Sequence, residues 1–370
     1  MKNILVKKIV PLSALLLAAL LFSSCQDVIL DNIRKEVALE EGSITGDIRS
    51  IVRFKDCYYL ANGGIRYKKN DTNYYGAWLN APAPNGQVIK LAADKNYLYA
   101  LTGVSAEDQK EGVNIGKSRN LYYSEDGSTW KPVTDFANAG SMDYNKNKPI
   151  GLYIFCTNTI NEANRSAYLI VNSTKDYGIA DMAYKLNGDK ISEMELGTVN
   201  ADTKPISNKT LVSQSCVYCN GEVRFFTSTG STTNETEFKE PTIYYYGYSS
   251  KLRWGGAISN SEGVSCKGGV LSVGVTADYI LVGTDSGISH HPLNDSVPGA
   301  KTDFTTNAEA TLSSAYRVLS ILVVRPELNE AQTPIYASQV YTGNGSSNSA
   351  QFDHIGLWAY YPSRGNWNRE

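Results

Sequence analysis

Residues 88–103 read "VIKLAADKNYLYALTG" and contain the pattern that repeats along the chain. Aliphatic and β-branched residues fill the first half, Asp94, Lys95 and Asn96 form a polar break, and an aromatic-rich second half ends at Gly103. Such a pattern predicts two short antiparallel strands joined by a tight turn. Similar stretches occupy 50–64, 151–173, 211–230, 271–287 and 318–343.

The second strands of these hairpins begin near residues 57, 97, 167, 222, 279 and 335, so the unit recurs about every 40–70 residues. A repeating all-β unit of this length is typical of a β-propeller with four-stranded blades. We therefore expect one all-β domain over 44–370, with six four-stranded blades. Seven blades is the alternative, because 141–150 has room for an additional strand.

The later strands of the units also repeat. Aromatic runs lead through a polar turn to a tryptophan in "LYYSEDGSTWKPV" (121–133), "IYYYGYSSKLRWGGA" (243–257) and "LWAYYPSRGNWNRE" (357–370). Trp130, Trp254 and Trp367 occupy the same place, and we expect each to open a fourth strand. Because the sixth unit uses the sequence up to residue 370, we expect a strand near 37–42 to help close the ring.

The turn at 124–130 has the pattern Ser-x-Asp-Gly-x-Thr-Trp. It resembles the Asp-box, or BNR repeat, of sialidases and related propellers. The resemblance implies a structural turn in which Asp126 accepts hydrogen bonds from backbone amides with Ser124 beside it, Gly127 permits the backbone conformation and Trp130 packs over the hairpin. It also places Asp126 on the face opposite the one where propellers usually bind ligands.

The first residues predict export. Lys2, Lys7 and Lys8 precede an apolar run over 9–22, which is typical of a signal peptide. The following "LFSSCQD" (21–27) resembles the lipobox of bacterial lipoproteins, so we expect a signal peptide over 1–24, lipidation of Cys25, and a lipid anchor and tether over 25–43. Gln26 favours sorting to the outer membrane, with the periplasmic or cell-surface face left open. An ordinary cleavable signal is the alternative.

Composition and motifs argue against several function classes. The formal net charge of −2 gives no basic field for a nucleic-acid partner. Neither the three histidines, His290, His291 and His354, nor the "CVYC" pair, Cys216 and Cys219, has the partners of a metal site, and we expect no metal and no cofactor. Five cysteines remain if Cys25 is lipidated, and an odd number excludes a complete disulfide framework.

A sialidase-like activity is the main enzymatic alternative. The resemblance would imply an Arg-Ile-Pro sequence and an arginine clamp, but Arg53 is followed by Phe54. The plausible clamp residues are Arg66, Arg224, Arg253 and Arg317. We expect the protein not to be an enzyme, although this point stays open.

Long stretches at 103–120, 228–242 and 343–354 predict loops that gather around the central funnel on one face. Asp353, His354, Arg66 and Arg224 are the candidate ligand-binding residues. The favoured hypothesis is a membrane-anchored, non-catalytic propeller that binds a glycan or an envelope protein. The alternatives are a glycoside hydrolase or lyase on the same scaffold and a structural subunit of an envelope complex.

Overall fold

A computed structural model describes residues 44–70, 77–103, 120–138, 151–172, 182–194, 216–219, 222–228, 243–248, 252–257, 271–284, 287–292, 316–341, 355–363 and 365–370. The chain divides into two compact units, Met1–Glu40 and Glu41–Glu370, and every described residue belongs to the second. Within the described ranges, no helix is both long and apolar enough to cross a membrane. Residues 1–43, including Cys25, lie outside the described residues.

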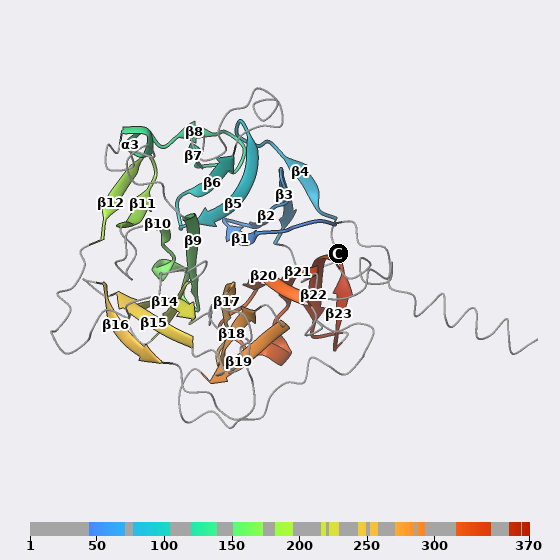
Figure 1. The fold of residues 1–370 in the computed structure, drawn as a ribbon. Coiled ribbons are helices and arrows are strands. Elements are labelled where there is room, and N and C mark those ends of the chain that lie inside the picture. Colours follow the sequence, from blue (N-terminus) through green and yellow to red (C-terminus); the bar gives the residue numbers. More distant parts are fainter. Residues whose placement is uncertain are drawn as a thin grey trace, which may run out of the picture. The chain divides into compact units, whose positions relative to one another are not determined.

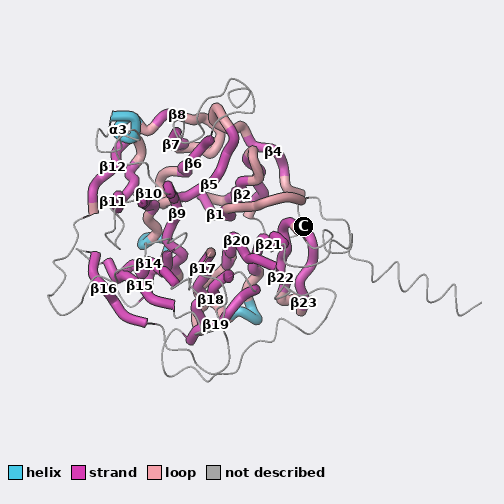
Figure 2. Tube along the Cα trace, viewed as in Figure 1, coloured by secondary structure: helices cyan, strands magenta, loops and turns pink. Residues whose placement is uncertain are grey.

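The second unit is an all-β propeller whose sheets are arranged around a common centre (Figures 1 and 2). Its first two blades have four strands each, in sequence order. The first contains β1 (Ser50–Phe54), β2 (Cys57–Ala61), β3 (Ile65–Lys69) and β4 (Leu79–Ala81). The second contains β5 (Gln87–Ala93), β6 (Leu98–Gly103), β7 (Asn120–Ser124) and β8 (Lys131–Pro132).

The last two sheets follow the same plan. One has three strands in its described part, β17 (Ser272–Val275), β18 (Tyr279–Thr284) and β19 (Gly287–Pro292). The other has four, β20 (Tyr316–Val323), β21 (Ile335–Tyr341), β22 (Gly356–Tyr361) and β23 (Asn366–Arg369). The short helices among the described residues are α3 (Thr134–Asn138), η2 (Glu162–Asn164) and η3 (Glu330–Gln332).

The middle of the chain forms one eight-stranded sheet in the order β12-β11-β10-β9-β13-β14-β15-β16. Its first half contains β9 (Gly151–Thr159), β10 (Ala167–Asn172), β11 (Met182–Asn187) and β12 (Lys190–Glu193). Its second half contains β13 (Cys216–Cys219), β14 (Glu222–Ser228), β15 (Ile243–Tyr248) and β16 (Leu252–Ala257). The halves join because β9 and β13 pair in parallel.

This joint corrects the expected blade number. The described strands form five hydrogen-bonded sheets, so the propeller has five blades, one of them double, and not the six or seven that the sequence predicts. The predicted hairpins are present in every unit, including β1–β2, β5–β6 and β20–β21. The sequence pattern marks hairpins through their turns, but it contains no signal for parallel pairing between the first strands of two successive units.

Turns that contain glycine in one blade pack against tyrosine side chains of the preceding blade. Gly127, between β7 and β8, has φ +80°, and a Cβ there would lie 2.2 Å from the Tyr59 hydroxyl of the first blade. Gly188, between β11 and β12, has φ +61°, and a Cβ there would lie 3.1 Å from the ring of Tyr97 in the second blade. The positive φ favours glycine at both positions, and at Gly127 the space requires it as well.

The first described residues complete the last blade. The amide of Ile44 donates to the Glu370 carbonyl at 2.9 Å, and the amide of Leu357 donates to the Ile44 carbonyl at 3.1 Å. Ile44 and Ile48 are fully buried in the apolar cluster that contains Tyr336. The predicted closing strand near 37–42 lies outside the described residues.

Candidate functional site

The first strands of the blades are linked by small polar side chains. The amide of Ile51 in β1 donates to the Ser320 hydroxyl of β20 at 2.8 Å. The amide of Leu91 in β5 donates to the Ser50 hydroxyl of β1 at 2.7 Å. These links satisfy buried backbone donors of strands that do not pair in a common sheet, so they set how closely the innermost strands approach.

Two further links continue this arrangement. The Ser272 hydroxyl of β17 donates to the Val318 carbonyl of β20 at 2.8 Å. The side-chain amide of Asn158 in β9 donates to the Val273 carbonyl of β17. The same Asn158 nitrogen lies 3.5 Å from the Cys216 carbonyl of β13. Asn158 therefore holds three first strands together at the centre of the propeller.

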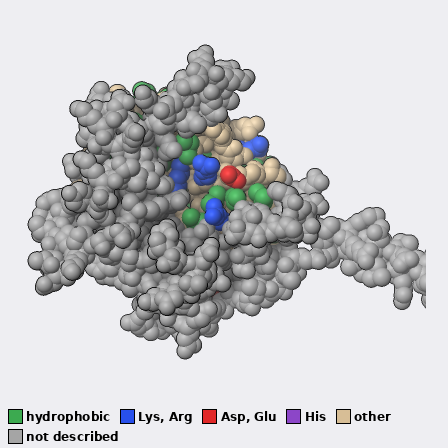
Figure 3. Space-filling view, viewed as in Figure 1, with side chains coloured by type: hydrophobic (Ala, Val, Ile, Leu, Met, Phe, Trp, Pro, Cys, Tyr) green, Lys and Arg blue, Asp and Glu red, His purple; other side chains and the backbone are tan. Residues whose placement is uncertain are grey.

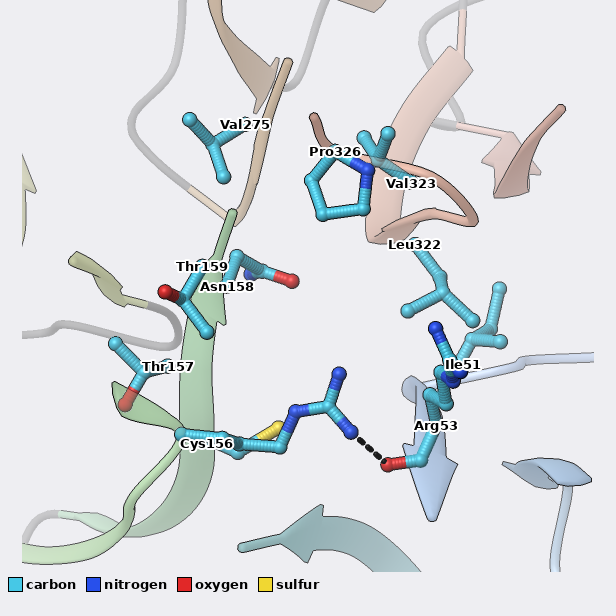
Figure 4. Close-up of a pocket in the computed structure, with 11 residues that line it drawn as sticks. Ile51, Arg53, Cys156, Thr157, Asn158, Thr159, Val275, Leu322, Val323 and Pro326 are labelled. Atoms are coloured by element: carbon cyan, nitrogen blue, oxygen red, sulfur yellow. Dashed lines mark hydrogen bonds between the residues drawn. The ribbon is translucent and has the colours of Figure 1, made fainter. Parts of the chain in front are cut away.

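One pocket, here called the Arg53 pocket, opens among these strands (Figure 4). Its polar lining residues come from β1, β9 and the segment after η2. The guanidinium of Arg165 donates to the backbone carbonyl of Arg53 at 2.8 Å, the contact marked by the dashed line in Figure 4. This bond fixes the Arg165 guanidinium at the Arg53 backbone, and Asn158 and Thr159 also line the pocket. Apolar lining comes from Ile51, Val275, Leu322, Val323 and Pro326.

The Arg53 pocket lies at the end of the first strands where β1 turns into β2 and β9 turns into β10. On that same face, the Lys55 ammonium, in the turn after β1, donates to the Glu125 carbonyl in the turn after β7. The face that carries the Asp126 turn therefore also carries a pocket. The sequence predicts the ligand site on the other face.

A second pocket, here called the Lys90 pocket, lies beside the first and shares Ile51, Cys156 and Asn158 with it. Arg49 and Lys90 supply its positive charge. Its remaining polar lining comes from the serines of the links described above, Ser50, Ser272 and Ser320. In the space-filling view, Lys and Arg side chains gather near the middle of the visible face, with a smaller area of Asp or Glu beside them (Figure 3).

Lys90 is the most perturbed cation of the site. It is only 8% exposed, and burial, followed by the positive charge of Arg49, lowers its pKa from 10.5 to about 8, while the nearby Cys156 acts in the opposite direction. Desolvation penalises the charged form of a buried amine. At neutral pH Lys90 is still mainly protonated, so the pocket contains a cation that the protein holds at an energetic cost.

The predicted ligand-binding residues do not converge in the described part of the chain. Arg66 is in β3, opposite Leu60 of β2 and Asn80 of β4. Arg224 is in β14, and its guanidinium lies 3.1 Å from the Glu222 carboxylate. Neither lines the two pockets. Asp353 and His354 lie outside the described residues, as do most of the predicted long loops.

The turn at 124–130 has the hydrogen bonds of a self-contained polar turn. One Asp126 oxygen accepts from the amides of Ser128 and Thr129, each at 2.7 Å, and from the Ser124 hydroxyl at 2.9 Å. The Thr129 hydroxyl donates to the other oxygen at 2.8 Å. These donors, the Thr129 amide first, hold the pKa of Asp126 well below its usual range. A structural role for this turn stays a prediction.

Trp130 has a different contact from the one expected. Its indole nitrogen donates to the Pro82 carbonyl at 2.9 Å, in the segment that connects the first blade to the second. Trp130 therefore joins the turn at 124–130 to the connection between the first two blades.

The cysteines and histidines show no metal cluster in the described ranges. Cys57, Cys156 and Cys216 are not in disulfide bonds, and burial raises the pKa of the Cys216 thiol well above its usual value. Cys216 and Cys219 are the two ends of β13, and His290 and His291 are neighbours in β19.

Sequence reasoning missed the pocket residues, although one signal for them was present. In "RSIVRF" (49–54), Arg49, Ile51 and Arg53 alternate with period two and therefore share one face of a strand. All three line the two pockets. Arg165 and Lys90 had no such signal, because their positions depend on how neighbouring blades meet.

No family model and no curated protein matches the chain. Among solved structures, it is similar to the N-terminal domain of Nup159 (TM-score 0.36, 9% identity, 79% of this chain and 73% of that chain). It is also similar to the C-terminal domain of gp131 from bacteriophage phiKZ (0.38, 14%, 86% and 80%) and to the Bombyx mori GH32 beta-fructofuranosidase BmSUC1 (0.37, 9%, 91% and 67%). Similarities with TM-scores this low support no inference about this chain. Its assignment as a propeller rests on its own β-sheets.

Proposed function

We propose that the protein is a non-catalytic, membrane-anchored binding propeller of the cell envelope, and that it holds the end group of a glycan in the two central pockets. The observation that carries this proposal is the pocket lining. Arginine, lysine, asparagine, serine and threonine side chains gather where the first strands meet. Such side chains supply the directed hydrogen bonds by which a largely preformed pocket selects a polar ligand.

The same lining favours binding over hydrolysis. Most glycoside hydrolases use a pair of Asp or Glu side chains on either side of the bond that they cleave. Among the described residues that line the two pockets, there is no Asp or Glu. Glycoside hydrolysis is therefore the less supported function of the central pockets.

A glycan array on the soluble chain 25–370 with Cys25→Ser tests the ligand class. We expect a small set of glycans to bind, and the same glycans to be recovered intact after long incubation. Cleaved glycan would overturn the non-catalytic assignment. If no glycan binds, the glycan assignment is wrong, and an envelope protein becomes the ligand to search for.

Membrane anchoring is tested separately, because it depends on Cys25 and not on the pockets. We expect labelled palmitate to mark the wild-type protein and to leave Cys25→Ser unlabelled. The variant should leave the membrane fraction, because stable anchoring requires the acyl chains. An unlabelled wild-type protein, or a Cys25→Ser variant that stays with the membrane, would contradict lipidation as the anchor.

A further inference from the structure

Four cationic residues line the two central pockets, although the chain as a whole is slightly acidic. Arg53 and Arg165 line the Arg53 pocket, and Arg49 and Lys90 line the Lys90 pocket. The pockets are continuous in lining, since Ile51, Cys156 and Asn158 belong to both. Lys90 is the buried member of this set, and the positive charge of Arg49 acts on it; like charges repel more strongly in a desolvated space than in water.

Irregularities in β5 and β20 lie next to two of the residues that line the Lys90 pocket. The register of β5 with β6 shifts between Val88 and Lys90, and that of β20 with β21 shifts between Val318 and Ser320. Lys90 and Ser320, which follow these irregularities, both line the Lys90 pocket. Such β-bulges commonly re-aim a side chain near a functional site. The bond from Arg165 to the Arg53 carbonyl fixes the other end of the cluster.

We propose that the central pockets bind a single oxyanion group, a carboxylate, sulfate or phosphate, at the end of the ligand. This inference deepens the proposed function by naming the part of the glycan that enters the pockets. Its physical basis does not require a glycan. An oxyanion between these side chains accepts charge-assisted hydrogen bonds from the arginines and offsets the cost of holding Lys90 charged while buried.

The size of the pockets sets the size of the group. The volume open to the centre of a water molecule is about 20 Å³ in the Arg53 pocket and about 30 Å³ in the Lys90 pocket. A single water needs about 10–15 Å³ by this measure. Each pocket therefore encloses space for a few heavy atoms, which fits one oxyanion group.

Thermal unfolding of the soluble chain 25–370 with Cys25→Ser tests the inference with defined probes. Sodium sulfate and sodium phosphate are compared with sodium chloride at equal ionic strength, and sodium glucuronate is compared with glucose. A ligand that binds only the folded state raises Tm. We expect sulfate or phosphate, at ten times its Kd, to raise Tm by about 2 °C relative to chloride.

Variants separate specific binding from a general salt effect. Arg165→Gln and Arg49→Gln should each lose most of the additional Tm increase. Arg325→Gln should keep it, because Arg325 is 53% exposed, pairs with Glu327 and lines neither pocket. An equal increase in all variants, or no difference from chloride in the wild-type protein, would overturn the oxyanion site.

The same measurement distinguishes a carboxylate ligand from a sulfate or phosphate ligand. It also distinguishes failure of the oxyanion site from failure of the glycan assignment. An increase with glucuronate but not with glucose indicates a carboxylate-bearing ligand, whereas an increase with sulfate or phosphate alone indicates one of those esters or the free ion. A specific Tm increase in a protein that binds no glycan would leave the oxyanion site standing and overturn the glycan assignment. Binding of neutral glycans alone, without a specific Tm increase, would support the glycan assignment and overturn the oxyanion site.

Discussion

The Lys68 ammonium lies 2.8 Å from the Glu370 carboxylate, although the two residues are 302 positions apart in sequence. Lys68 is in β3 of the first blade, and Glu370 directly follows β23 of the last. The indole nitrogen of Trp78 also donates to this carboxylate at 3.0 Å. The rings of Trp78 and Tyr336 lie 5.7 and 5.3 Å from the ammonium. The pair and its aromatic surround connect the first blade to the last.

We therefore expect Lys68→Met to lower the free energy of unfolding by about 3 kcal/mol, because it leaves the Glu370 carboxylate buried without its cation. The side chains of Lys68 and Glu370 are only 2% and 10% exposed, so solvent screens the pair weakly. The double variant Lys68→Met/Glu370→Gln should recover part of the loss. Urea unfolding of the four proteins in a double-mutant cycle measures the coupling, and additive effects would contradict a coupled pair.

The turn at 124–130 gives a second prediction, which compares the stabilisation by glycine at position 127 with that by the hydrogen bonds of Asp126. Gly127→Ala should cost about 2 kcal/mol, because alanine is strained at φ +80° and its Cβ would meet the Tyr59 hydroxyl. Gly127→Ala/Tyr59→Phe should recover part of this loss. Asp126→Ala should cost only about 1 kcal/mol, because the turn amides that lose their acceptor are exposed to water.

The pH dependence of the Asp126 variant follows from its lowered pKa. A carboxylate with a lower pKa in the folded state stabilises it fully above the unfolded value, near 3.8, and loses this effect as the pH falls through the folded value. The difference between wild type and Asp126→Ala should therefore be constant at neutral pH and shrink below about pH 4. Loss of ligand binding in Asp126→Ala, in a protein that melts like wild type, would contradict a structural role.

The links between first strands lead to a third prediction. Ser320→Ala removes the acceptor of the buried Ile51 amide and should cost about 1–3 kcal/mol, because an unsatisfied buried donor loses its hydration without compensation. Ser128→Ala is the matched control, since Ser128 is exposed and uses its backbone amide in the turn. Equal unfolding midpoints for the two variants would show that the link does not stabilise the ring.

Local patterns predicted the hairpins well, because turn residues and alternating apolar residues act over a few positions. "VIKLAADKNYLYALTG" became β5 and β6, and the tryptophan in "GNWNRE" (365–370) became Trp367 in β23. Relations between blades could not be predicted in this way. The β9–β13 pairing, the Ser320–Ile51 bond and the Lys68–Glu370 pair each join segments that are distant in sequence.

The lining of the two central pockets could not be predicted from the sequence for the same reason. The sequence directs attention to the long stretches that end in Asp353 and His354, because such loops often carry function. The described pockets are instead lined by β1, β5, β9, β17 and β20, whose mutual approach depends on serine and asparagine bonds between blades. A single arginine in a strand gives no sign that three other cationic residues line the same pocket or the adjoining one.

Lys90 gives the last prediction, which tests the electrostatics of the central pockets without any ligand. Its pKa is lowered from 10.5 to about 8 by burial and then by Arg49, so between these values the unfolded chain binds a proton that the folded chain does not. Stability therefore rises with pH across this window. Arg49 and the Cys156 thiol are neighbours whose charges act on Lys90. We expect the free energy of unfolding of the wild-type protein to increase by up to about 3 kcal/mol from pH 8 to pH 10.5. Lys90→Met should abolish this increase and should be more stable than wild type at pH 7.

Urea unfolding at pH 7, 8.5 and 10 measures both effects. Lys95→Met is the control, because Lys95 is an exposed lysine of the neighbouring turn. Parallel pH profiles for wild type and Lys90→Met would show that Lys90 is not held charged at a cost, and would remove the electrostatic argument for an oxyanion in the pockets.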